Sequence, residues 1–154
     1  LDLGLGYGAS AAAQTTLYAE AGLGYTAVLD GGSGHREGNR NWQGLVGLES
    51  AGPVGGRLEA AETMSRLWVS ADLTYRLAPR DRALRPYALL GGGFVMDWSD
   101  TDPLLTLGAG LRAQLSRLIF LFTEARLQWV PSMAATSGEA RLILPLTVGL
   151  GVGY

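Results

Sequence analysis

The residue types that could perform acid-base or nucleophilic chemistry gather around the single histidine of the chain, His35. Ser33 lies two positions before it and Asp30 lies nearby, so a hydroxyl, a base and a carboxylate occur in one short segment. A nucleophilic site of this kind works only when a third group holds the base rigidly. Because residues 30–40 read DGGSGHREGNR, which is rich in glycine and polar residues, we favour a solvated loop there.

A second candidate is the group of carboxylates in the segment DWSDTD, residues 97–102. Asp97, Asp100 and Asp102 could supply the hard oxygen ligands that Ca²⁺ or Mg²⁺ prefers. An acidic loop in water has the same composition, and we favour that interpretation. The sequence has no phosphate-binding loop, no dinucleotide fingerprint and no histidines at metal-ligand spacing, so we expect no enzymatic activity and no cofactor.

The composition narrows the class of protein. The chain has 154 residues, which is the length of one domain, and it has no cysteine for disulfide or thiolate chemistry. Its formal net charge of −2 argues against a nucleic-acid partner, which would require a basic face. The 23 glycines accompany 47% hydrophobic and only 17% charged residues, so disorder does not explain them. Small residues on the inner face of a β-barrel leave room for larger neighbours, and that is the role we expect for them.

The strongest pattern is in the last sixteen residues, EARLILPLTVGLGVGY, residues 139–154. Every even position from Leu142 to Tyr154 is apolar, whereas the odd positions are mostly small or polar. This period of two is typical of a β-strand with one apolar face. A strand that spans a membrane needs about 9 to 11 residues with lipid on one side and a lumen on the other. The segment therefore predicts the closing strand of a transmembrane barrel.

The same alternation recurs along the chain and predicts an all-β fold, a transmembrane antiparallel up-and-down barrel of eight strands occupying residues 15–154. The strands are expected at residues 15–29, 41–50, 57–64, 67–77, 87–98, 105–115, 118–130 and 139–154. The alternation changes phase near Ser65, so a short loop or a bulge is expected there. Glu62 falls on the face otherwise assigned to lipid. Residues 99–103 are expected to form an acidic loop.

Two assignments stay open at the start of the barrel. Residues 1–14 are either an N-terminal extension or an extra strand. In the rival assignment residues 1–11 form the first strand and residues 56–78 form one long bent strand, which again totals eight.

Charged residues fall on the inward face of these strands. They comprise five acids and five bases, so the interior can close as an ion-pair network, whereas an unpaired buried charge would cost several kcal/mol. Carboxylates poised for acid-base catalysis are the competing interpretation, which we do not favour because such networks are common packing solutions. The expected network consists of Glu20, Glu49, Arg57, Glu59, Asp72, Arg76, Arg112, Glu124, Arg126 and Arg141.

Aromatic residues mark the expected membrane interfaces, where an amphipathic ring lies best at headgroup level. If the C-terminus is periplasmic, Trp42, Trp98 and Trp129 all lie at the outer rim. Tyr75 and Tyr154 then lie at the inner rim.

Three segments give the chain a resemblance to a known family: LWVSADLTYRLAP with RPYALLGGGF (67–79 and 85–94), FTEARLQWV (122–130), and the ending LPLTVGLGVGY. From about residue 15 to residue 154 the chain resembles the small outer-membrane barrels of diderm bacteria, the eight-stranded OmpA-transmembrane-like and OmpX-like group. The resemblance implies an integral outer-membrane location and outer-membrane lipids as partners. It also implies that the barrel-assembly machinery reads the C-terminal strand through Leu146, Val148, Leu150, Val152 and Tyr154.

The fold does not settle the activity, because it hosts adhesins, anchors and lipid-modifying enzymes. Our leading hypothesis is a barrel with a closed, ion-paired lumen that acts as an envelope anchor or as an accessory subunit of an assembly with other envelope proteins. The alternatives are an outer-leaflet lipid-modifying enzyme and a small pore or transporter. A soluble lipocalin-like barrel would require polar outward faces, and the outward faces are apolar.

Overall fold

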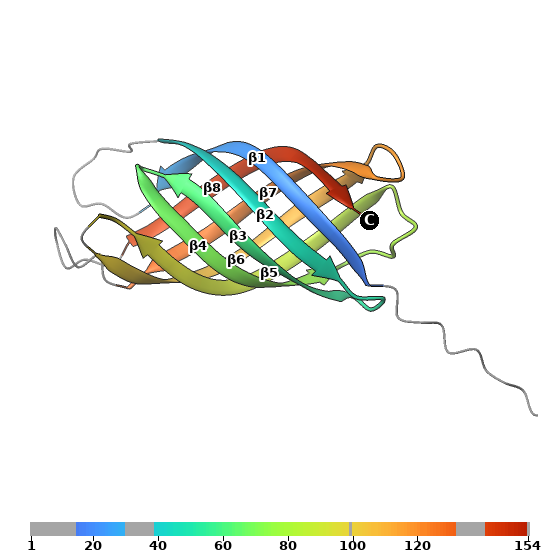
Figure 1. The fold of residues 1–154 in the computed structure, drawn as a ribbon, viewed down its shortest axis with the longest axis horizontal. Helices are drawn as coiled ribbons and strands as arrows, with labels where there is room; N and C mark the ends of the chain where they lie inside the picture. The colour runs from blue at the N-terminus through green and yellow to red at the C-terminus, as the bar shows by residue number, and fades with distance from the viewer. Residues whose placement is uncertain (1–14, 30–38, 99, 132–140, 154) are drawn as a thin grey trace, which may run out of the picture.

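The computed structural model describes residues 15–29, 39–98, 100–131 and 141–153. Eight strands occur among them, each pairing antiparallel with the next, and β8 pairs with β1 to close a barrel (Figure 1). This confirms the predicted all-β, up-and-down architecture. The strands are β1 (Thr16–Val28), β2 (Asn39–Glu49), β3 (Val54–Thr63), β4 (Arg66–Arg76), β5 (Leu84–Met96), β6 (Thr101–Gln114), β7 (Ile119–Val130) and β8 (Arg141–Gly153).

The pairing of β8 with β1 answers which strand the C-terminal strand closes against. The register runs from Tyr18 opposite Gly153 to Val28 opposite Ile143. The closing partner is therefore the strand that begins at Thr16. Residues 1–14 lie outside the described part of the chain.

The rival assignment of residues 56–78 to one bent strand is wrong. Thr63 pairs with Arg66, so β3 and β4 form a hairpin whose two-residue turn is Met64 and Ser65. Both turn residues have positive φ angles, 56° and 60°, as the tight hairpin turns compatible with strand twist require. The phase change near Ser65 is thus a turn and not a bulge.

Residues 99–103 were expected to form a loop, and this expectation is wrong for most of the segment. Strand β6 begins at Thr101, and Asp102 pairs with Val95. Asp102 and Leu104 continue the inward phase of β6, and both are buried. The pairing of β5 with β6 continues into this segment because the inward phase of β6 is unbroken. Its acidic residues had suggested a loop in solvent.

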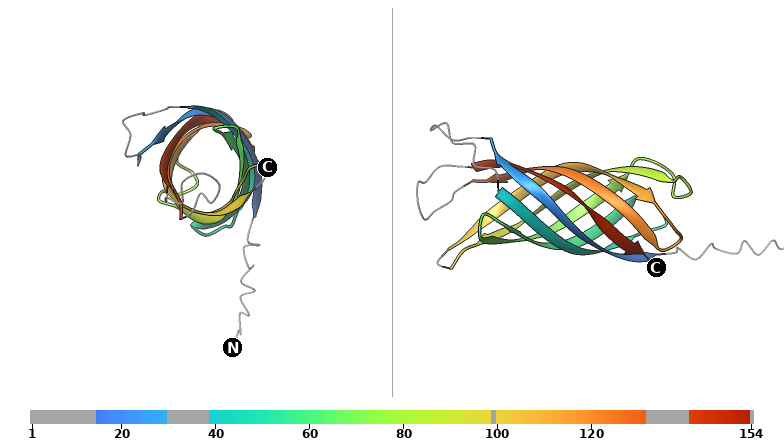
Figure 2. Two further views of the ribbon diagram at one scale, coloured as in Figure 1. Left: turned by 90° about the vertical axis from the view of Figure 1, so that its left-hand side faces the viewer. Right: turned by 90° about the horizontal axis from the view of Figure 1, so that it is seen from above.

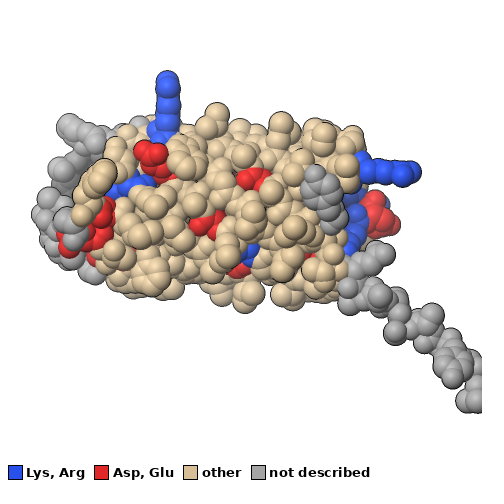
Figure 3. Space-filling view, in the orientation of Figure 1, with Lys and Arg blue, Asp and Glu red and all other residues tan. Residues whose placement is uncertain are grey.

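The polarity of the two faces of the sheet is the reverse of that in a water-soluble barrel. Large apolar side chains point outward and are exposed, for example Leu23 at 69% and Leu73 at 64%, whereas Glu124 and Arg126 point inward and are 3% and 2% exposed. Figure 3 shows the result, a mostly uncharged outer face between two charged ends. No helix in the described ranges is long and apolar enough to cross a membrane.

The two ends of the barrel differ in their connections (Figures 1 and 2). We call the end with the β2–β3, β4–β5 and β6–β7 connections the turn end, which also holds the end of β8. We call the opposite end, where β3 joins β4 and β5 joins β6, the loop end.

Candidate functional site

The candidate site is the charged interior of the barrel. Nine of the ten charged residues expected there have described side chains, and all nine are buried or half-buried on the inward face: Glu20, Glu49, Arg57, Glu59, Asp72, Arg76, Arg112, Glu124 and Arg126. The tenth, Arg141, pairs with Val130 through the backbone, and its side chain lies outside the described part.

Two arginine–glutamate pairs cross the full width of the lumen. Arg57 on β3 donates two hydrogen bonds to Glu124 on β7, at 2.6 Å from Nη1 to Oε2 and 3.0 Å from Nη2 to Oε1. Arg126 on β7 returns two to Glu59 on β3. Because β3 and β7 are four strands apart in a closed ring of eight, they face each other across the barrel. Paired forks of this kind are the strongest type of protein hydrogen bond, so the two pairs brace opposite walls.

The carboxylates of this network are supported unequally. Glu124 accepts hydrogen bonds from Arg57, from Arg126 and from the hydroxyl of Tyr87, the last at 2.5 Å from its Oε2. Among the described residues Asp72 accepts one hydrogen bond, from Arg57 Nε at 3.0 Å, and its other oxygen, Oδ1, has no partner there. Arg57 is therefore the group that stabilises the negative charge of Asp72.

A third arginine, Arg112, lies among aromatic rings closer to the turn end. Its guanidinium carbon is 4.2 Å from the ring centroid of Tyr18, 4.9 Å from that of Tyr87 and 5.3 Å from that of Phe120. It forms an ion pair with Glu20 at 2.6 Å and another with Glu49 on β2, the strand opposite to β6. Cation–π contacts gain strength when water is excluded, so the rings hold this charge inside the barrel.

Two of these rings lie directly over glycines on neighbouring strands. A Cβ atom at Gly47 would overlap the ring of Tyr18, and a Cβ atom at Gly110 would overlap the ring of Tyr87. The glycines thus provide the space in which large inward side chains lie flat against the wall, as the sequence led us to expect.

Towards the loop end an apolar layer lies next to the ion-pair network. It consists of the buried side chains of Trp68, Val95, Leu104, Val130 and Ile143. Trp68 donates its indole N–H to the carbonyl of Thr63 at 3.1 Å, so its polar atom is satisfied within this layer. The residues come from five different strands, and no local pattern in the sequence links them.

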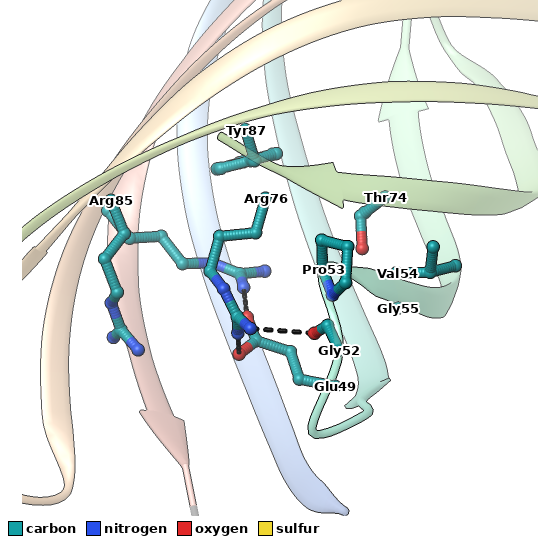
Figure 4. Close-up of a pocket in the computed structure, with 10 residues that line it drawn as sticks. Glu49, Gly52, Pro53, Val54, Gly55, Thr74, Arg76, Arg85 and Tyr87 are labelled. Carbon is teal, nitrogen blue, oxygen red and sulfur yellow. Dashed lines mark hydrogen bonds and ion pairs between the residues drawn. The ribbon is translucent and has the colours of Figure 1, made fainter. Parts of the chain in front are cut away.

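At the turn end the network reaches a mouth that sequence reasoning described only in part. Glu49 pairs with Arg76 at 3.2 Å, and Arg76 also donates to the carbonyl of Gly52 at 2.7 Å (Figure 4). Glu49 pairs with Arg80 as well, at 3.7 Å. Arg80 and Arg85 lie in the segment PRDRALRP, which we expected to be only a charged turn; the density of arginine there was the available signal. The cavity at this mouth has a volume of about 10 Å³, the space of about one water molecule.

Aromatic residues lie at both ends of the outer face. Trp42, Trp98 and Trp129 are exposed near the loop end, and Tyr75 is exposed near the turn end. Tyr154 lies outside the described residues. The indole of Trp42 donates to Glu62 Oε2 at 2.8 Å, which gives the outward carboxylate of Glu62 a partner on the adjacent strand.

The other candidate chemistry is only partly described. Asp30, Ser33 and His35 lie outside the described residues. Asp97 forms an ion pair with Arg66 at 3.3 Å, whereas Asp102 points into the barrel. Among the described residues no three His, Cys, Asp or Glu side chains come together as metal ligands would.

Comparison with known proteins finds similar folds but no match by sequence. No protein-family model matches the sequence, and neither does any curated protein sequence. The structure is similar to Neisserial surface protein A, with a TM-score of 0.70 at 12% identity over 90% of this chain and 96% of that one. It is also similar to the N-terminal β-barrel domain of Pseudomonas aeruginosa OprF, with a TM-score of 0.63 at 18% identity over 92% and 99%. A third similar structure is Ail of Yersinia pestis, with a TM-score of 0.55 at 15% identity over 90% and 99%. The fold of this chain is that of the small outer-membrane β-barrels.

Proposed function

We propose that the chain is an integral outer-membrane barrel with a closed lumen that acts structurally, as an anchor or as an accessory subunit of a cell-envelope assembly. The apolar outward faces support insertion in lipid, because only a closed barrel or a helix satisfies all its backbone groups there. Its fold and the aromatic side chains near each end of its outer face support the outer membrane as its location.

The observation that carries the proposal is the pair of braces between β3 and β7. Arg57, Glu59, Glu124 and Arg126 meet in the middle of the lumen and fill its width with hydrogen-bonded charge. An ion crossing the barrel would have to separate these pairs and also pass the apolar layer around Trp68. Separating buried partners costs several kcal/mol, which disfavours steady conduction.

Two measurements test the proposal. The folded chain should resist SDS until it is heated and so migrate differently with and without boiling, and in planar bilayers it should give no steady conductance. A variant in which Arg57, Glu59, Glu124 and Arg126 are all replaced by serine and Trp68 by alanine removes both braces and opens the apolar layer, and we expect it to conduct if it keeps heat-dependent migration. Steady conductance of the unmodified chain would overturn the closed lumen and favour the small pore. Identical migration of boiled and unboiled samples would overturn the membrane barrel itself.

The competing hypothesis of an outer-leaflet lipid-modifying enzyme depends on His35, Ser33 and Asp30. Lipid deacylation by the chain that is lost in the variant His35→Ala would favour that enzyme. Unchanged deacylation in the variant would remove His35 as its base.

Partners follow from the same proposal. The outward side chains of Leu146, Val148, Leu150 and Val152 are exposed along β8, as a signal read by the barrel-assembly machinery requires. Together with Tyr154 they form the proposed assembly signal. Purification of the native complex in mild detergent, followed by identification of the proteins that accompany the chain, tests for other envelope proteins.

A further inference from the structure

The described residues at the two ends of the barrel carry opposite net charge. The two cavities at the turn end are lined by six arginines and two carboxylates: Arg76, Arg80, Arg82, Arg85, Arg112, Arg117, Glu49 and Asp81. Near the loop end the described residues comprise two arginines and four carboxylates: Arg40, Arg66, Glu62, Asp97, Asp100 and Asp102. In Figure 3 arginine side chains project from the right-hand end, which is the turn end.

Three of the arginines at the turn end are not neutralised. Glu49 pairs with Arg76, Arg80 and Arg112, whereas Arg82, Arg85 and Arg117 form no ion pair within the described part of the chain. Arg85 donates one hydrogen bond to the side chain of Gln114, and its buried Nε has no acceptor among the described residues. A buried guanidinium donor without an acceptor is costly, so it favours an anion that would supply one.

These three arginines line one groove with a volume of about 620 Å³ between the β4–β5 and β6–β7 turns. Leu115 and Leu118 line it as well, and they are 63% and 50% exposed. The groove therefore combines arginine forks, which suit phosphate oxygens, with apolar side chains at the edge of the lipid-facing surface. A ligand that fits both parts has a phosphate group and an acyl chain.

We infer that this groove binds the headgroup of an anionic phospholipid in the leaflet at the turn end, with the phosphodiester on Arg82, Arg85 and Arg117 and an acyl chain against Leu115 and Leu118. The inference rests on the proposed membrane insertion of the barrel. A soluble phosphate compound would contact the arginines but not the leucines. Contact with the leucines therefore distinguishes a phospholipid from a soluble phosphate compound.

The test is native mass spectrometry of the full chain released from nanodiscs that contain phosphatidylglycerol and phosphatidylcholine. We expect retained phosphatidylglycerol. In the variant Arg82→Gln/Arg117→Gln the affinity for phosphatidylglycerol should fall about 25-fold. Each arginine near an anionic lipid surface contributes about 1 kcal/mol, and about 1.4 kcal/mol corresponds to a tenfold change in affinity. The matched control Arg40→Gln/Arg66→Gln removes the same charge at the loop end, and we expect less than a twofold change.

Four results would overturn the inference. Equal loss in both double variants would indicate general charge attraction, and equal retention of the two lipids would remove the preference for an anionic headgroup. Displacement of phosphatidylglycerol by an equal concentration of glycerol 3-phosphate would indicate a site for free phosphate. Migration in SDS before and after boiling separates the two levels of the argument. A folded barrel without lipid preference refutes the lipid site alone, whereas a chain that does not insert refutes the proposed function as well.

Discussion

Replacing Arg57 by methionine tests whether the interior of the barrel is a closed ion-pair network. Methionine keeps a long unbranched side chain in the lumen but removes the guanidinium that pairs with Asp72 at 3.0 Å and Glu124 at 2.6 Å. Glu124 keeps Arg126 and the Tyr87 hydroxyl as partners. Asp72 loses the one hydrogen bond that its carboxylate accepts from the described residues. The variant therefore leaves one buried carboxylate without a partner.

The expected destabilisation is about 3–5 kcal/mol, the usual cost of breaking a buried ion pair by removing one partner. The double variant Arg57→Met/Asp72→Leu removes the orphaned carboxylate as well, so most of this loss should be recovered. Replacing both partners of a buried pair by apolar groups is often neutral or stabilising. Glu59 and Glu124 keep Arg126 in both variants.

Equilibrium unfolding in urea from lipid vesicles, followed by tryptophan fluorescence, measures these differences by linear extrapolation. Arg40→Met is the matched control, because Arg40 is exposed, lies outside the proposed lipid groove and forms no ion pair within the described chain, and its effect should stay within about 0.5 kcal/mol. A loss below about 1 kcal/mol for Arg57→Met would mean that water solvates Asp72, since a hydrated carboxylate needs no arginine. The closed lumen would then be refuted together with the energetic argument.

Two further predictions address the space in the lumen and the depth of the barrel in the bilayer. Gly110→Ala should destabilise the barrel by about 1–3 kcal/mol, because the new methyl group overlaps the ring of Tyr87, whereas Gly44→Ala should be nearly neutral because nothing lies within 4 Å of its added methyl group. Equal unfolding free energies for the two variants would contradict the packing described. In single-tryptophan variants, lipids brominated near the headgroup should quench Trp129 strongly and Trp68 weakly, since Trp129 is exposed and Trp68 is 3% exposed inside the barrel. Equal quenching would place Trp68 in contact with lipid.

The direction in which most of these side chains point follows from the sequence alone. In a strand successive side chains point to opposite faces, so once one residue is assigned to lipid the parity of all others in that strand is determined. This reasoning placed Glu124 and Arg126 inward and Leu127 outward without knowledge of any neighbour. It also predicted a short loop or a bulge near Ser65, because the phase of the alternation changes there, and the structure has a two-residue turn at this position.

The pairing of these charges could not be predicted in the same way. Arg57 and Glu124 are 67 positions apart, and they meet only because four strand connections bring β3 and β7 to opposite sides of the ring. Charge at a strand end misled the prediction for Asp102, since an acidic residue near other acids suggests solvent even where the inward phase continues. The alternation within one strand determines where each side chain points, whereas the partner of each charged side chain depends on closure of the whole barrel.

The architecture of the barrel depends in turn on these ion pairs. The two braces form only if β3 lies opposite β7 and both strands keep their register. A slip of one residue in β3 would turn Arg57 towards lipid and leave Glu124 and Asp72 with fewer partners, because side chains alternate with a period of exactly two. A wider ring would separate β3 and β7 beyond the combined reach of an arginine and a glutamate. The same four charges therefore favour one strand number and one register over the alternatives. This specificity is a reason for the closed lumen that we propose to keep charges in place of an apolar core.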